Sequence, residues 1–117
     1  MYATIDQRQQ SILTMKHKGK SLRATYSKYG NGQNAILLNY ASNGQSYMVA
    51  SVALDHPLQS DEVAIKNYSE NEGILDTLLD AGIIATPHRF VSSGFVQIPI
   101  CKLLKPWKQI ILKTFIP

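Results

Sequence analysis

The sequence predicts an α+β domain, with a mainly antiparallel sheet of about five to seven strands and one helix over about residues 70–81 on one face. Three observations support this fold class. Short apolar segments are separated by Asn31-Gly32 and Asn43-Gly44, and Asn-Gly pairs are typical of tight turns between antiparallel strands. Residues 66–82 are the only segment with a helical pattern and a signal at each end. The length of 117 residues is enough for one domain with a core.

The first expected strands, residues 12–17 and 22–28, flank Lys18-Gly19-Lys20, which reads as a hairpin turn. The competing interpretation is a helix over residues 7–18 that ends at Gly19, so strand or helix stays open for residues 1–18. The two Asn-Gly turns then place strands at residues 35–40 and 47–54.

A short strand over residues 62–66 leads into the helix, and residues 89–92 and 95–101 form the last hairpin. Pro99 has no N–H for a ladder, so this last strand is expected at an edge or bulged.

The helix has a capping-box pattern, because Ser69 and Glu72 have the S-x-x-E spacing in which each side chain satisfies an N–H group of the first turn. Gly82 stands where a left-handed residue closes a helix. The apolar stripe that would face the sheet consists of Ile74, Leu75, Leu78 and Leu79.

Residues 1–104 are expected to form the single domain, and residues 105–117 a basic, apolar C-terminal tail. Trp107, Ile110, Ile111 and Phe115 lie on one helical face of this tail. The tail either packs onto the sheet or serves as an anchor for a partner or for self-association as a homodimer.

Composition excludes several classes of protein. No apolar segment approaches the 18 residues or so of a membrane-spanning helix, and residues 1–10 lack the features of a secretory signal. The single cysteine, Cys101, permits no intramolecular disulfide, which is typical of a cytoplasmic protein.

The net charge of +4 hides a segregation of charge. Residues 1–54 have six Lys/Arg and one acid, residues 55–80 have seven acids and Lys66, and residues 81–117 have five Lys/Arg and no acid. The segments either interleave and neutralise one another or form two oppositely charged faces.

No catalytic or metal-binding motif is present, and no cofactor is expected. His17, His56 and His88 are far apart in the sequence, and we interpret them as surface or capping residues. A Cys101 nucleophile paired with His56 or His88 is conceivable, but Cys101 ends an apolar strand and reads as a buried small residue. We therefore expect a protein that is not an enzyme.

Two surfaces are candidates for binding. Glu62, Glu70, Glu72, Asp76 and Asp80 include a solvated acidic helix face, of which Glu70, Asp76 and Asp80 are the candidate partner-binding residues. The alternative is a nucleic-acid surface on the first strands, where basic and aromatic side chains alternate. Its residues are Lys16, Lys18, Lys20, Arg23, Tyr26 and Lys28.

Residues 65–75 (IKNYSENEGIL), 79–84 (LDAGII) and 93–101 (SGFVQIPIC) resemble a family of small proteins, a domain of unknown function, encoded by phages, plasmids and integrative elements. The resemblance covers about residues 12–104, and the tail departs from it. It implies no catalytic residues. It implies a small cytoplasmic protein of a bacterial host that binds a host protein complex stoichiometrically, as anti-CRISPR and anti-restriction inhibitors do.

Overall fold

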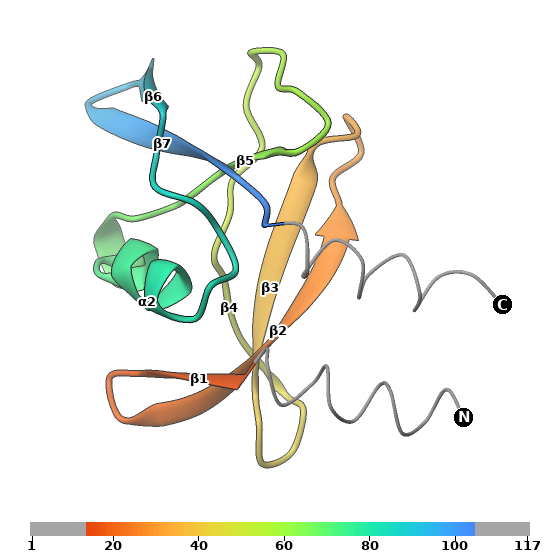
Figure 1. Ribbon diagram of the computed structural model, residues 1–117, viewed down its shortest axis with the longest axis vertical. Helices are drawn as coiled ribbons and strands as arrows, with labels where there is room; N and C mark the ends of the chain where they lie inside the picture. Colours follow the sequence, from red (N-terminus) through yellow and green to blue (C-terminus); the bar gives the residue numbers. More distant parts are fainter. Residues whose placement is uncertain (1–13, 105–117) are drawn as a thin grey trace, which may run out of the picture.

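The computed structural model describes residues 14–104 and contains seven strands and two short helical segments (Figure 1). The α+β class with one α-helix is confirmed, but the strands divide between two antiparallel sheets instead of forming one. The four-stranded sheet has the order β1-β2-β3-β4, and the three-stranded sheet has the order β5-β7-β6. The strands are β1 (Thr14–His17), β2 (Lys20–Lys28), β3 (Asn34–Tyr40), β4 (Ser46–Val49), β5 (Glu62–Ala64), β6 (Arg89–Ser93) and β7 (Val96–Lys102).

The four-stranded sheet is a meander of three hairpins, as the turn signals predict. Residues 14–17 are β-strand, which excludes the helical alternative for them. Lys18 and Gly19 connect β1 to β2, and both have positive φ, 51° and 80°. That combination is the type I′ turn, whose twist matches that of the strands. At Gly32, also with positive φ, the turn between β2 and β3 closes with a 2.9 Å hydrogen bond from its N–H to the Tyr29 carbonyl.

The two sheets meet where the chain leaves β4. Ala50 donates its N–H to the Ile36 carbonyl of β3 and accepts at its own carbonyl from Lys66, at 2.8 and 2.9 Å. Ser51 then forms an isolated bridge with Ile65, directly after β5. The chain therefore leaves the four-stranded sheet and joins the three-stranded sheet over residues 50 and 51. As a result, β4 ends at Val49, and the predicted strand 47–54 is divided between the two sheets.

The expectation for Pro99 is wrong, because β7 is the central strand of its sheet and its register is continuous on both sides. The ladder with β5 ends at the pair Ala64–Ile100, one residue before Pro99. There Ile65 donates its N–H to the Pro99 carbonyl at 3.0 Å. The backbone nitrogen of Pro99 therefore faces the position where β5 ends. No hydrogen bond from Pro99 to β5 is needed there, so proline is tolerated in this central strand.

The helical segment begins differently from the predicted capping box. Residues 69–71 form a 3-10 turn (η1, Ser69–Asn71), and helix α2 (Ile74–Asp80) begins only after Gly73. The first N–H groups of α2 are satisfied by Asn67, whose Oδ1 accepts from Gly73 at 3.1 Å and from Leu75 at 2.9 Å. Ser69 and Glu72 are linked only through their backbones, and both are exposed. Asn67 is the cap, and the predicted roles of Ser69 and Glu72 are wrong.

The end of α2 agrees with the sequence. Gly82 has φ 75°, its N–H bonds to Leu79, and the N–H of Ile83 bonds to Leu78. This pair of bonds is a Schellman motif, which needs a residue that tolerates the left-handed conformation. Ile74 and Leu78 are completely buried, as the apolar stripe predicts.

The core has a larger and a smaller part. The larger part lies between the four-stranded sheet, α2 and one face of the three-stranded sheet, and includes Leu22, Ile36, Leu38, Ile65, Leu78 and Cys101. The smaller part lies on the opposite face of the three-stranded sheet and contains Leu54, Ala64, Val91, Ile98 and Ile100. The three-stranded sheet is therefore packed on both faces near β5, whereas the β6–β7 hairpin projects beyond α2 (Figure 1).

Within residues 14–104, no helix is long and apolar enough to cross a membrane.

Candidate protein-binding surface

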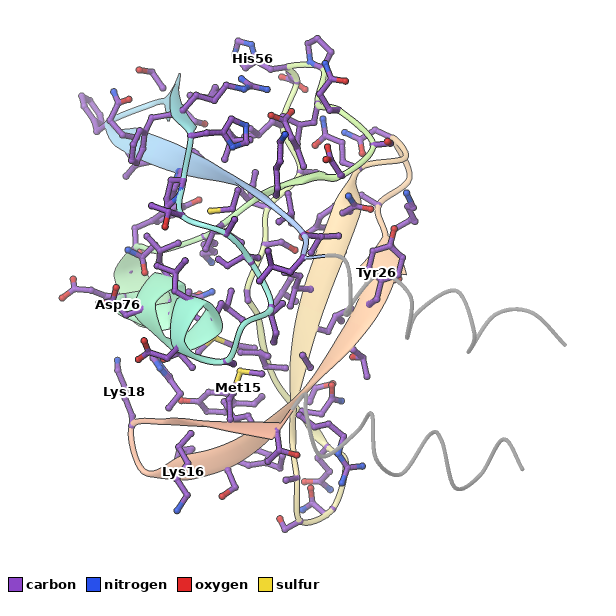
Figure 2. All side chains as sticks on the ribbon, in the orientation of Figure 1. Met15, Lys16, Lys18, Tyr26, His56 and Asp76 are labelled. Carbon is purple, nitrogen blue, oxygen red and sulfur yellow. The ribbon has the colours of Figure 1, made fainter. Side chains whose placement is uncertain are left out.

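The acidic residues of the helical segment form an exposed ridge along η1 and α2. This acidic ridge consists of Glu70, Glu72, Asp76 and Asp80, all of which are exposed. Figure 2 shows Asp76 pointing away from the body of the molecule. The side chain of Glu70 accepts a 2.7 Å hydrogen bond from Lys66, four residues earlier. This contact lowers the pKa of Glu70 and raises that of Lys66.

Within residues 14–104, the other three carboxylates of the ridge make no ion pair. In the described part of the chain, the only ion pairs are Lys66–Glu70 and the two that Glu62 makes with His88 and Arg89. Glu72, Asp76 and Asp80 thus face solvent without an ion-pair partner among the described residues. Exposed charges of this kind can act on a basic partner, and dissolved salt screens them.

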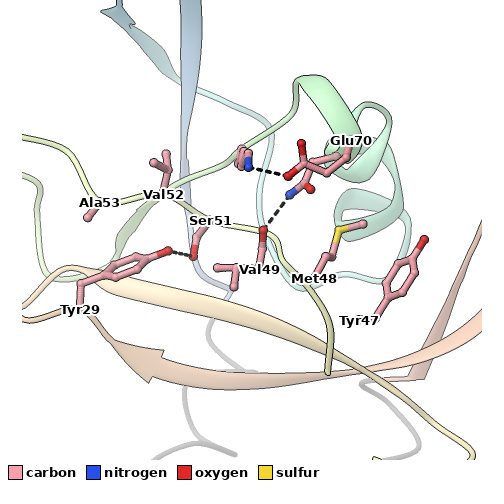
Figure 3. A pocket seen from close by; sticks show the side chains of 10 residues that line it. Tyr29, Tyr47, Met48, Val49, Ser51, Val52, Ala53 and Glu70 are labelled. Carbon is pink, nitrogen blue, oxygen red and sulfur yellow. Dashed lines mark hydrogen bonds and ion pairs between the residues drawn. The ribbon is translucent and has the colours of Figure 1, made fainter. Parts of the chain in front are cut away.

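A hollow of about 380 Å³ adjoins the ridge at Glu70 (Figure 3). Its walls come from β4, the crossing segment and η1, and they are largely apolar. Two contacts fix these walls: Tyr29 and Ser51 share a hydroxyl hydrogen bond of 2.9 Å, and buried Asn71 donates to the Val49 carbonyl at 2.7 Å. The apolar part of the lining includes Tyr29, Tyr47, Met48, Val49 and Val52. An apolar hollow beside fixed charges is a typical anchor point for a partner side chain.

The six candidate nucleic-acid residues do not converge on one surface. The register of β1 and β2 places Lys16 and Arg23 on one face, and Lys20, Tyr26 and Lys28 on the other face with buried Leu22 and Ala24. Lys18 stands in the turn, far from Tyr26 (Figure 2). The Tyr26 hydroxyl donates to Asn34, and its ring packs against the larger core.

The four tail residues, Trp107, Ile110, Ile111 and Phe115, lie outside the described residues, so their predicted role stays a prediction.

A cluster around Glu62 was not predicted as a unit. The Glu62 side chain is 4% exposed, and its oxygens accept from His88 Nε2 at 2.5 Å and Arg89 Nη2 at 2.9 Å. The Gln59 N–H also donates to it at 2.8 Å. Its hydrogen bond with Arg89 is the main cause that lowers the pKa of Glu62 to about 2. The cluster ties the edge strands β5 and β6 together across β7, a structural role.

His17 and Cys101 are both buried. His17 is 5% exposed and buried against α2, so its predicted place at the surface is wrong. Its Nδ1 lies 2.8 Å from the Thr77 hydroxyl, and its buried Nε2 has no partner. Burial lowers the pKa of His17, and nearby Lys18 lowers it further. Cys101 is completely buried as predicted, and desolvation raises the pKa of its thiol to about 12. A thiol with this pKa is a poor nucleophile.

The chain matches no protein-family model, no curated protein and no solved structure. The resemblance to mobile-element proteins therefore stays a prediction.

Proposed function

We propose that this protein acts by binding another protein stoichiometrically, through the acidic ridge and the adjoining hollow. The observation that supports this proposal most strongly is the combination of three exposed carboxylates, Glu72, Asp76 and Asp80, which make no ion pair within residues 14–104, with an apolar hollow at the end of the same segment. Charges of one sign give specificity and fast association, and a buried apolar contact gives affinity.

The ridge fits a partner with a basic surface. A protein that binds nucleic acid presents such a surface along its channel. This chemistry, together with the resemblance of residues 65–101 to mobile-element proteins, supports a narrower proposal. The protein is a counter-defence inhibitor that docks on the effector complex of a CRISPR or restriction system in the cytoplasm of a bacterial host.

Nucleic-acid binding through the basic residues of β1 and β2 is the alternative. It would require Lys16 and Lys20 to act from opposite faces of the hairpin. A binding constant that falls steeply with salt would favour it, because each phosphate contact releases counterions.

The test is affinity capture from host lysate with and without nuclease, comparing the wild type with Asp76→Lys/Asp80→Lys. The matched control is Asp55→Lys/Asp61→Lys, which reverses two acids of the loop before β5, away from α2 (Figure 1). We expect a nuclease-resistant partner that is captured by the wild type and the control and lost by the ridge variant. Equal capture by both variants would refute the role of the ridge, and capture only without nuclease would favour the alternative.

A further inference from the structure

We propose that the free edge of β6 pairs with β6 of a second copy of this chain, so that two three-stranded sheets become one continuous sheet of six. This inference concerns a surface other than the acidic ridge and does not depend on the proposed function. The starting point is topological. In the described part of the chain, β6 pairs only with β7, and its hairpin projects from the molecule (Figure 1).

The hydrogen bonds of β7 show which backbone groups of β6 are free. The Pro99 carbonyl points to the β5 side, where it accepts from Ile65, and the Ile100 carbonyl points to the β6 side, where it accepts from His88. Because alternate residues of a strand point to opposite neighbours, Ile98 also faces β6, and its partner Val91 faces β7. The N–H and C=O groups of Phe90 and Ser92 therefore point out of the sheet.

Natural sheets guard their edges with charged side chains, proline, bulges or a covering segment. On β6 the one charged side chain, Arg89, is bound to Glu62, and within residues 14–104 no strand other than β7 pairs with β6. Here the outward-facing residues are a phenylalanine and a serine, and the Phe90 side chain is 58% exposed. Phe95, in the turn that joins β6 to β7, is fully exposed. Two large apolar side chains thus lie beside an open hydrogen-bonding edge.

The edge is complementary to itself. With Val91 of the two copies facing each other on a two-fold axis, Phe90 of each copy stands opposite Ser92 of the other. Both residues face outward, so each such pair exchanges two hydrogen bonds, about four in total. Phe90 and its equivalent are then diagonal neighbours on one face, about 7–8 Å apart, within contact range for aromatic rings.

Charge also permits this register. Arg89 of one copy stands opposite Ser93 of the other, so no like charges are paired. The Arg89 side chain remains bound to Glu62 of its own copy. A second copy is the occupant that places a neutral residue, Ser93, opposite Arg89 and pairs only neutral residues at positions 90–92. The contact is short, so the dimer is expected to be weak and to depend on concentration.

Sedimentation equilibrium of the full chain over a concentration series tests the proposal. Ser92→Pro removes an N–H that points outward and leaves the ladder with β7 intact, and Ser92→Ala is the matched control. We expect the wild type and Ser92→Ala to dimerise, and the dissociation constant of Ser92→Pro to rise at least about tenfold. Phe90→Lys, a change at an exposed site, should also prevent dimerisation by placing two lysines diagonally across the axis. A wild type that stays monomeric, or dimers unaffected by both substitutions, would overturn the proposal.

Disulfide trapping tests the register itself. In this arrangement the Cα atoms of the two Val91 residues are about 4.5 Å apart, within the range of a disulfide. Oxidised Val91→Cys should therefore form a covalent dimer. Ser93→Cys, although more exposed, should not, because residue 93 faces Arg89 and lies far from its own equivalent. Cys101 does not interfere, since it is completely buried. Equal crosslinking of both variants would contradict the register.

Discussion

The substitution Glu62→Gln tests the energetics of the fold most sharply. It keeps the shape of the side chain and removes the charge that Arg89 and His88 neutralise. The pKa of Glu62 is about 2 in the folded chain, against an ordinary value of 4.5. Each tenfold change in a protonation constant corresponds to about 1.4 kcal/mol, so the charged form stabilises the fold by about 3 kcal/mol. The Arg89 side chain is 41% exposed and keeps part of its hydration, so we expect a loss of about 2–3 kcal/mol at pH 7.

The pH dependence provides the check. Because the folded-state pKa lies below the ordinary value, this stabilisation is complete above pH 4.5 and disappears as the pH falls from 4.5 to about 2. Urea unfolding of the wild type and Glu62→Gln should therefore show a difference at pH 3 that is less than about half of the difference at pH 7. Glu70→Gln removes a carboxylate of an exposed ion pair and is the control, with no measurable change expected.

Two results would refute this reasoning. Unfolding free energies of the wild type and Glu62→Gln that agree within about 0.5 kcal/mol at pH 7 would show that the charge does not stabilise the fold. An equal loss at pH 7 and pH 3 would show that altered packing, and not the ion pair, causes the effect.

Three further predictions concern local structure. Asn67→Ala should lower the free energy of unfolding by about 1–2 kcal/mol, because two N–H groups of the α2 N-terminus lose their acceptor. Ser69→Ala should change it by less than about 0.5 kcal/mol. If urea unfolding shows the larger loss for Ser69→Ala, the capping box is correct. Lys18→Asn should raise the free energy of unfolding by about 0.5 kcal/mol, since asparagine tolerates the positive φ of a type I′ turn better than lysine. An unchanged or lower melting temperature would contradict this prediction. The free energy of unfolding should decline as the pH falls below 6.5, because the lowered pKa of His17 lets the unfolded chain bind the proton first. His17→Gln should remove this decline, and an identical decline in both chains would rule out His17.

The features that local sequence determines were predicted well. The turns at Asn31-Gly32 and Asn43-Gly44 and the helix end at Gly82 depend on glycine at positive φ, a property of single residues. Burial of Ile74 and Leu78 follows from helical spacing alone.

The errors concern choices that tertiary contacts make. Asn67 and Ser69 are both acceptable caps by residue type, but Ser69 opens the 3-10 turn Ser69–Asn71, and Asn67 accepts from the first N–H groups of α2. The division into two sheets depends on the pairing of Ala50 with Lys66 and of Ser51 with Ile65. No local sequence pattern encodes this pairing. Pro99 was misplaced for the same reason, since the end of β5 decides which N–H groups β7 requires.

The candidate surfaces were predicted only in part. The exposure of Glu70, Asp76 and Asp80 follows from the helical period, but the hollow beside Glu70 requires β4 and η1 to meet. The cluster of Glu62 joins residues 26 and 27 positions apart. Its sequence signal was an acid that opens an otherwise apolar strand, together with His88 and Arg89 in a segment without acids.

The most direct test of the proposed function is a titration of the captured partner, once purified, with this protein. Binding and any inhibition should saturate together at about one equivalent, and Asp76→Lys/Asp80→Lys should weaken the affinity at least about tenfold while Asp55→Lys/Asp61→Lys does not. Complete inhibition at a small fraction of one equivalent would indicate catalytic turnover and contradict stoichiometric binding.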